Sequence, residues 1–209
     1  MKISLKNIGR RFNREWIFKH VDYEFTSGNS YAILGANGSG KSTLISVLNG
    51  SLTPSEGKVT YTTNQSTIDV SDIYKKISFA APYLELVETF TLRELINFHF
   101  KFKDFSSGMD ASKLIELLGL ERSANKEIRY FSSGMKQRTK LALAYCAANP
   151  VLFLDEPTSN LDVQGLDWYR ELNRNFSKDK LIIVGSNQEH EYDFCSDRIQ
   201  LSDYKFFKN

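Results

Sequence analysis

Residues 35–43 combine glycines, a lysine and hydroxyl side chains at the spacing of a phosphate-binding loop, Gly-x-x-x-x-Gly-Lys-Ser. Glycines let backbone N–H groups turn toward phosphate oxygens, and Lys41 adds a mobile cation. Ser42 offers a hydroxyl to Mg²⁺. The alternative, a chance glycine-rich turn, is disfavoured by the strand and helix predicted on either side. The predicted ATP contacts of this phosphate loop are Gly35, Ala36, Asn37, Gly38, Ser39, Gly40, Lys41, Ser42 and Thr43.

Two adjacent carboxylates, Asp155 and Glu156, follow the apolar run at residues 151–154. A carboxylate at the carboxyl end of a buried strand faces the crevice where α/β proteins bind ligands, so Asp155 is predicted to hold Mg²⁺ together with Ser42. Glu156 comes next and is predicted to act as the general base or to orient the attacking water. The alternative, an acidic turn before a helix, is disfavoured beside a complete phosphate loop.

A second loop of small residues, Ser132-Ser133-Gly134, begins a predicted helix. Free backbone N–H groups at a helix start bind anions, and small side chains allow close approach. Because the phosphate loop already supplies one such site, this loop is predicted to address a nucleotide bound elsewhere, for instance on a second copy of the chain. An ordinary serine N-cap is the alternative.

The elements that position these residues follow from hydrophobic periodicity. Strands are predicted at residues 3–8, 21–25 and 31–34, an edge strand at 58–62, and buried strands at 151–154 and 181–184. Helices are predicted at 41–49, from Thr91 with capping-box spacing, at 113–118, and at 133–148. The predicted fold class is therefore α/β: a P-loop NTPase core with a mixed, partly parallel sheet, an antiparallel N-terminal β region and a helical insert at about 83–148. We expect residues 1–209 to form one domain.

Composition narrows the function classes. The chain has 209 residues and a net charge of +2, which gives no broad electrostatic reason to expect a nucleic-acid partner. No apolar run approaches the roughly 20 residues that cross a bilayer, so a membrane role would come through another protein. Cys146 and Cys195 suit a reducing compartment, and the N-terminal segment lacks the apolar block of a secretion signal.

The order of phosphate loop, Ser-Ser-Gly loop, Asp-Glu strand and Ser159-Asn160-Leu161-Asp162 resembles ATP-binding cassette proteins over nearly the whole chain. The resemblance implies that residues 131–135 are the signature loop, usually Leu-Ser-Gly-Gly-Gln, and that Asp162 lies in a loop linking two ATP sites across a dimer. It further implies that Phe12 stacks on adenine, with Trp16 as the fallback. The signature-loop residues are Ser132, Ser133, Gly134 and Met135, of which the second and fourth depart from the family pattern.

Two further departures concern hydrolysis. Pro82 stands where the family usually carries a Gln that contacts Mg²⁺ and water, and Asn187 stands where it usually carries a His near the γ-phosphate. Asn can donate a neutral hydrogen bond but cannot carry a proton. His190 is a candidate substitute, although we expect it to face solvent on a short helix. Hydrolysis is therefore expected to be slow, while Glu156 argues that it is not abolished.

The resemblance implies an ATPase subunit of a membrane transporter, acting as a dimer that encloses two ATP with Mg²⁺. A homodimer is expected, held at the cytoplasmic face of the cell membrane by a transmembrane partner. Two alternatives remain: a soluble cassette protein working on ribosomes or DNA, and a slow or non-hydrolysing ATP sensor in a heterodimer.

Aromatic and basic side chains of the helical insert admit two interpretations. Phe98, Phe102 and Phe105 have near-helical spacing, which is typical of packing inside the insert. Alternatively, some of them line a groove for a short helix of a membrane partner, together with Tyr83 and Leu84. A solvated face is expected for the scattered lysines Lys75, Lys76, Lys101 and Lys103.

Overall fold

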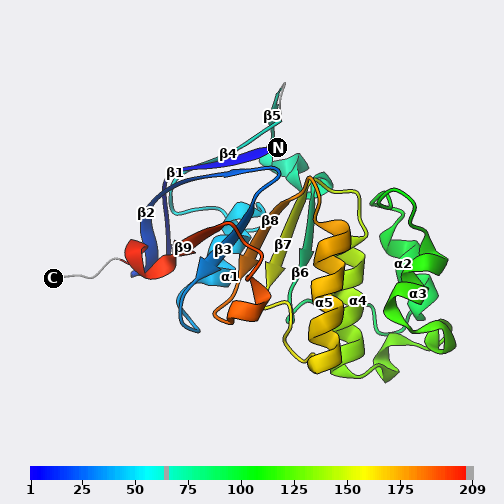
Figure 1. The fold of residues 1–209 in the computed structure, drawn as a ribbon. Helices are drawn as coiled ribbons and strands as arrows, with labels where there is room; N and C mark the ends of the chain where they lie inside the picture. Colours follow the sequence, from blue (N-terminus) through cyan, green and yellow to red (C-terminus); the bar gives the residue numbers. More distant parts are fainter. Residues whose placement is uncertain (64–65, 206–209) are drawn as a thin grey trace.

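A parallel β-sheet forms the centre of the molecule in the computed structural model, which describes residues 1–63 and 66–205 (Figure 1). Its strand order is β6-β7-β8-β3-β9, and every neighbouring pair is parallel. All residues of β7 and β8 are buried, as expected for continuous apolar runs in a sheet covered on both faces. The strands are β3 (Ser30–Leu34), β6 (Ile77–Ala80), β7 (Val151–Asp155), β8 (Leu181–Gly185) and β9 (Asp197–Gln200).

Alternate residues of these strands supply two cores on opposite faces of the sheet. Val151 and Phe153 pack in the core that contains helix α1 (Lys41–Leu48), whereas Leu152 and Leu154 pack in the core that contains α4 (Ser133–Tyr145) and α5 (Val163–Phe176). This is the period-two alternation of a strand. Figure 1 shows α4 and α5 side by side, and α1 on the opposite face of the sheet.

A second, antiparallel sheet of order β2-β1-β4-β5 packs over α1 and shares its core. Its strands are β1 (Lys2–Phe12), β2 (Glu15–Thr26), β4 (Glu56–Thr62) and β5 (Thr67–Ile68). The parallel and antiparallel parts of the predicted fold are thus separate sheets. The strand predicted as an edge at residues 58–62 is one only over residues 58–60, because β5 pairs with its outer side through Tyr61 and Thr62.

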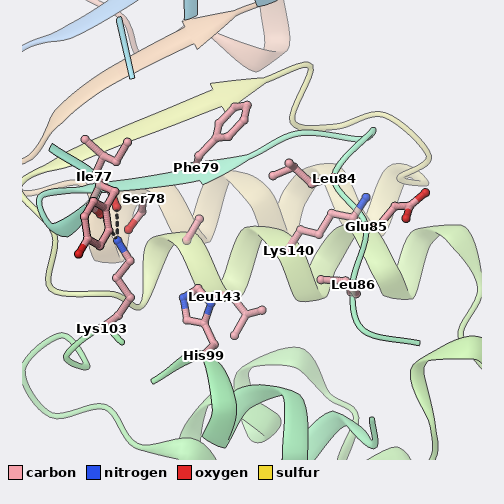
Figure 2. Close-up of a pocket in the computed structure, with 12 residues that line it drawn as sticks. Ile77, Ser78, Phe79, Leu84, Glu85, Leu86, His99, Lys103, Lys140 and Leu143 are labelled. Atoms are coloured by element: carbon pink, nitrogen blue, oxygen red, sulfur yellow. Dashed lines mark hydrogen bonds between the residues drawn. The ribbon is translucent and has the colours of Figure 1, made fainter. Parts of the chain in front are cut away.

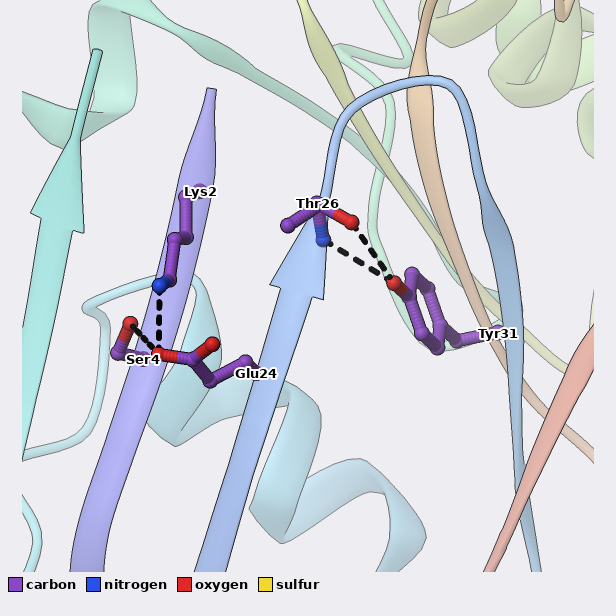
Figure 3. A network of polar contacts seen from close by, with 5 residues as sticks. All are labelled: Lys2, Ser4, Glu24, Thr26 and Tyr31. Atoms are coloured by element: carbon purple, nitrogen blue, oxygen red, sulfur yellow. Dashed lines mark hydrogen bonds and ion pairs between the residues drawn. The ribbon is translucent and has the colours of Figure 1, made fainter. Parts of the chain in front are cut away.

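Polar contacts tie β1, β2 and β3 together (Figure 3). The Lys2 ammonium and the Ser4 hydroxyl both reach the Glu24 carboxylate across the β1–β2 pair, the first at 2.6 Å. At the end of β2 the Thr26 backbone N–H donates to the Tyr31 phenol at 3.2 Å. Tyr31 belongs to β3, so this contact links the antiparallel sheet to the strand that leads into the phosphate loop.

The helical region contains α2 (Leu92–His99) and α3 (Ala111–Leu118), and its core includes side chains of α4. The capping box predicted at Thr91 is present: the Thr91 hydroxyl accepts from Glu94 N and the Glu94 carboxylate accepts from Thr91 N. Helix α4 ends at Tyr145, earlier than predicted, because the chain beyond it pairs with residues 104–106; Ser106 N donates to Cys146 O at 2.7 Å. Short 3-10 helices complete the structure: η1 (Val70–Lys75), η2 (Glu121–Ser123), η3 (Ile128–Tyr130), η4 (Glu189–Glu191) and η5 (Leu201–Tyr204).

The carboxyl ends of four neighbouring strands bring the predicted site residues to one edge of the parallel sheet. Gly35 follows β3, Asn187 lies two residues beyond β8, Asp155 ends β7, and Tyr83 lies three residues beyond β6. This is the edge at which α/β sheets bind ligands. Among the described helices, none combines the length and apolar character that a bilayer crossing requires.

Candidate functional site

The phosphate loop requires glycine where the backbone is left-handed and closely packed. Gly40 is the N-cap of α1 with φ 107°, and a Cβ there would lie 2.3 Å from Ile17 Cγ2. A Cβ on Gly35 would lie 2.5 Å from Ser39 Oγ. Any larger residue would therefore clash or strain the turn. The glycines keep the loop narrow at the start of α1, where backbone N–H groups and the helix dipole favour an anion.

Lys41 is held across this loop by neutral groups. Its ammonium donates to Gly35 O at 2.8 Å and to Ala36 O at 3.3 Å. Lys41 as a whole is only 5% exposed to solvent. Because both partners are neutral carbonyls, they orient the cation without cancelling its charge. A preoriented cation beside free backbone N–H groups is suited to phosphate.

A cavity of about 250 Å³ opens over the loop. Its lining brings Glu156 together with the phosphate loop, as expected, but also includes Ile17 of β2, which the sequence interpretation missed. Alternation extended back through β2 would have found a strand there, though not what this side chain touches. The lining residues are Ile17, Asn37, Gly38, Gly40, Lys41, Ser42, Thr43 and Glu156.

The two candidate adenine stackers lie on the β1–β2 hairpin that carries Ile17. Phe12 is 46% exposed, with the Arg10 guanidinium 4.5 Å from its ring centre. Trp16 packs against Gly9, and the Lys19 ammonium lies 4.2 Å from its ring. Neither aromatic lines the phosphate cavity. Phe12 is exposed enough to stack on a base, so Phe12 rather than Trp16 remains the predicted adenine-stacking residue.

Asp155 has one carboxylate oxygen paired and one without a partner. Its Oδ2 accepts from the Tyr83 hydroxyl at 2.9 Å, whereas Oδ1 is buried and makes no hydrogen bond. Burial raises the pKa of Asp155, and the hydroxyls of Ser42 and Tyr83 oppose that rise by hydrogen bonding. An unpaired carboxylate oxygen beside a serine hydroxyl fits Mg²⁺, which prefers such hard oxygen ligands.

Glu156 has a backbone conformation that is unusual for its residue type. Its φ is 43°, in the left-handed region that non-glycine residues seldom adopt, and its N–H donates to Gly185 O at 2.9 Å. This sharp turn directly after β7 places the side chain on the wall of the phosphate cavity. The sequence predicted the carboxylate but not the strained turn that aims it.

Two buried side chains hold this turn from opposite sides, and sequence reasoning missed both. From α4, Gln137 is 1% exposed and its Nε2 donates to Pro157 O at 2.8 Å. From η4, Glu191 is fully buried; its carboxyl group accepts from Thr158 N at 2.8 Å, from the Thr158 hydroxyl and from Ser186 Oγ. These bonds join the loop after β7 to the loop after β8. The position of the catalytic candidate Glu156 therefore depends on residues distant in sequence.

Glu191→Ala is expected to destabilise the chain by about 2–4 kcal/mol, because it leaves buried donors at Thr158 and Ser186 without an acceptor. For a domain of this size we expect the midpoint of thermal unfolding to fall by roughly 5–10 °C. Calorimetry measures the shift. Glu189→Ala in the same 3-10 helix removes an exposed carboxylate and should change stability by less than about 0.5 kcal/mol. Equal shifts of the unfolding midpoint in the two variants would contradict the conclusion that Glu191 holds the loops after β7 and β8 together.

The loop after β8 brings Asn187 to the phosphate loop and places His190 against the loop after β7. Asn187 Nδ2 donates to Asn37 Oδ1 at 3.2 Å, so this side chain touches the phosphate loop. His190 lies on the expected short helix but is only partly exposed to solvent. Its Nε2 lies 3.1 Å from Thr158 Oγ1, because η4 packs against the loop after β7. In this position His190 contacts the loop after β7 and does not line the phosphate cavity.

The signature loop lies at the start of α4 and packs on the loop that contains Asp162. Ser132 is the N-cap, its hydroxyl accepting from Met135 N at 3.2 Å. A Cβ on Gly134 would lie 3.1 Å from Asn160 O, so the small residue permits the contact. Asp162 in turn caps α5 by accepting from Gly165 N at 2.8 Å. None of residues 132–135 lines the phosphate cavity of the same chain.

A family model described as ABC transporter matches residues 18–159, a span that contains the phosphate loop, the signature loop, Asp155 and Glu156. The chain belongs to the ABC transporter family. The resemblance and the fold class predicted from the sequence are thereby confirmed.

Curated relatives carry the same description. The uncharacterized ABC transporter ATP-binding protein YybJ of Bacillus subtilis is 27% identical over 202 residues, covering 96% of this chain and 92% of the relative. The linearmycin resistance ATP-binding protein LnrL of the same organism is 28% identical over 205 residues, with 96% and 66% covered. The chain thus spans nearly all of one ABC relative and 66% of the other.

Solved structures show the same ABC fold. The dimeric bacterial ABC transporter cassette MJ0796 superposes with a TM-score of 0.76 at 24% identity, over 95% of this chain and 94% of that one. An ATP-binding subunit of an ABC transporter gives a TM-score of 0.80 at 21% identity, over 96% and 85%. The predicted function, an ABC transporter ATP-binding subunit with ATPase activity, is confirmed at the level of the family, and nothing in these comparisons favours either alternative.

Proposed function

We propose that this ABC protein works as a homodimer that binds two Mg²⁺-ATP at shared sites and drives a transmembrane partner at the cytoplasmic face of the membrane. The observation that carries the proposal is the separation of two anion-binding surfaces in one chain: the phosphate cavity contains Lys41 and Glu156, whereas residues 132–135 lie outside it. A second copy would bring its signature loop to the first copy's nucleotide. The proposal treats residues 1–209 as one ABC domain with the helical region at about 83–148 inside it.

The chain's own residues divide the chemistry of hydrolysis among them. Lys41 and the loop N–H groups would bind and orient the phosphates, and Ser42 with Asp155 would hold Mg²⁺, which neutralises developing phosphate charge when bound. Glu156 would accept a proton from the attacking water or orient it. Asn187, fixed beside Asn37, would donate a neutral hydrogen bond near the outer phosphate.

A groove of about 400 Å³ between β6, α2 and α4 is the proposed docking site for a short helix of the membrane partner (Figure 2). His99 also lines it, and burial lowers the pKa of this ring to about 4, so the imidazole is neutral near pH 7. Its apolar wall comprises Ile77, Phe79, Leu84, Leu86, Leu143 and Ala144.

The aromatic residues of the insert favour the packing interpretation over groove lining. None of Phe98, Phe102 and Phe105 lines the groove; Phe105 stacks on Phe100 with 3.5 Å between ring centres and packs against the core of the insert, whereas Phe102 is 71% exposed. Lys103 is not part of a solvated face. It lines the groove and its ammonium donates to Tyr74 O and Ile77 O, both at 2.6 Å, because the segment after α2 passes beside η1 and the start of β6.

Mixing two inactive variants tests the shared sites. Lys41→Ala disables the phosphate loop, and Ser133→Glu places a negative charge at the exposed start of α4, where the helix dipole tolerates it but a phosphate would be repelled. Each variant alone should hydrolyse ATP at least about tenfold more slowly than the unmodified chain. An equal mixture should recover about a quarter of the normal rate, because half of the random dimers contain one intact site.

The recovered rate is measured by phosphate release after co-refolding or subunit exchange. A mixture of Lys41→Ala with Lys41→Ala,Ser133→Glu is the matched control and should stay inactive. No recovery in the first mixture, with dimers demonstrated by sedimentation, would contradict a site shared between chains.

A further inference from the structure

The loop after β6 places a phenol directly on the predicted magnesium carboxylate. Tyr83 is 55% exposed overall, yet its hydroxyl donates to Oδ2 of Asp155, a residue that is 1% exposed. The ring is also positioned by an edge contact with Phe79 at 6.3 Å between centres. A long, half-exposed side chain that extends inward to a buried carboxylate is therefore held at both ends.

The contact divides the carboxylate into two unequal oxygens. With Oδ2 engaged by Tyr83, rotation of the Asp155 carboxylate is restricted, and Oδ1 is left buried and unpaired. The Ser42 hydroxyl lies close enough to both groups to lower the pKa of the phenol and of the carboxylate. Hydrogen bonds to the second oxygen of a metal-binding carboxylate orient the ligand and are worth about 10–100-fold in metal affinity or activity.

The neighbouring residue cannot supply this contact. Pro82 has no polar side-chain atom, and its carbonyl accepts from the Lys140 ammonium at 2.6 Å, which fixes the loop to α4. With the backbone fixed at Pro82, the next side chain is the one directed to the carboxylate. The missing polar group at position 82 is thus offset one residue later by a phenol.

We propose that Tyr83 is a positioning residue for magnesium, holding Asp155 so that Oδ1 is presented to the cation beside Ser42. The inference rests on the magnesium site of the proposed function. It assigns to Tyr83 an effect on metal affinity, and no effect on nucleotide binding in the absence of metal.

Tyr83→Phe removes only the hydroxyl and keeps the ring against Phe79. With Mn²⁺ as the probe and a non-hydrolysable ATP analogue bound, the dissociation constant for Mn²⁺, measured by electron paramagnetic resonance, should rise about tenfold. Affinity for the analogue in EDTA should stay within about twofold. In steady-state hydrolysis, the Mg²⁺ concentration for half-maximal rate should rise, and saturating Mg²⁺ should restore most of the rate.

Tyr23→Phe is the matched control, because this tyrosine lies on β2, packs against Phe25 and Tyr31, and does not line the phosphate cavity. It should leave Mn²⁺ binding unchanged. Unchanged Mn²⁺ affinity in Tyr83→Phe would overturn the inference, and tighter binding would overturn it too, since the phenol would then shield the carboxylate. If the unmodified chain bound no Mn²⁺ with the analogue, the magnesium site of the proposed function would be wrong. That outcome differs from one in which only the role of Tyr83 is wrong.

Discussion

Glu156→Gln is expected to reduce steady-state ATP hydrolysis by about 10²–10⁴-fold, because the amide can neither accept the proton of the attacking water nor attract it electrostatically. ATP affinity should stay within about threefold, since the phosphate-binding groups, Lys41 and the loop N–H groups, are left unchanged. Gln has nearly the same shape and the same difficulty with a left-handed backbone, so the turn at φ 43° is not newly strained. The change therefore isolates the carboxylate.

Single-turnover and steady-state phosphate release measure the loss, and equilibrium ATP binding measures what is retained. Dimers should also persist longer in Mg²⁺-ATP, which analytical ultracentrifugation detects. Glu116→Gln on the exposed face of α3 provides the control and should be indistinguishable from the unmodified chain. A steady-state rate within threefold of normal in Glu156→Gln would mean that another group performs the proton transfer.

Lys41→Ala is expected to weaken ATP binding by roughly 10²-fold, because it removes a nearly buried cation already oriented toward the phosphate position. Hydrolysis at a fixed, subsaturating ATP concentration should fall at least as far. The fold should survive, because Gly35 is only partly buried and Ala36 is exposed, so water can reach the two carbonyls that are released.

Isothermal titration with ATP measures the affinity, and the midpoint of thermal unfolding without nucleotide confirms that the chain is folded. Lys113→Ala is a matched control: this lysine also donates to a carbonyl, Gly108 O at 2.6 Å, but lies on α3 in the helical region. Affinity within threefold of normal in Lys41→Ala would remove the central assignment of the phosphate site.

Sequence reasoning predicted those parts of the site that depend on local patterns. The phosphate loop, the strand before Asp155 and the capping box at Thr91 all lie within a few residues of the features that reveal them, and the structure contains each of them. Parallel strands end at one edge of a sheet, so their convergence also followed from the predicted architecture.

Contacts between distant segments could not be predicted in this way. Glu191 and Gln137 are unremarkable in sequence, and their roles arise only because η4 and α4 pack on either side of the loop after β7. Pro82 was recognised as the wrong residue for its position, but no periodicity indicates that Tyr83 turns inward while being half exposed. The edge assignment at residues 58–62 failed at Tyr61 and Thr62 for the same reason, since the strand that pairs with them, β5, is only two residues long.

The left-handed turn at Glu156 has a consequence for how such chains diverge. A sequence selected for stability alone would place glycine or asparagine there, since either adopts a φ of 43° more easily than glutamate. Glutamate at this position costs the fold about 1 kcal/mol, a cost that selection for the proposed carboxylate role would offset. In a duplicated copy that no longer hydrolysed ATP, a carboxylate would no longer be required at this residue, and only the backbone preference of the turn would remain. Position 156 would then be among the first to drift toward a residue that favours the turn.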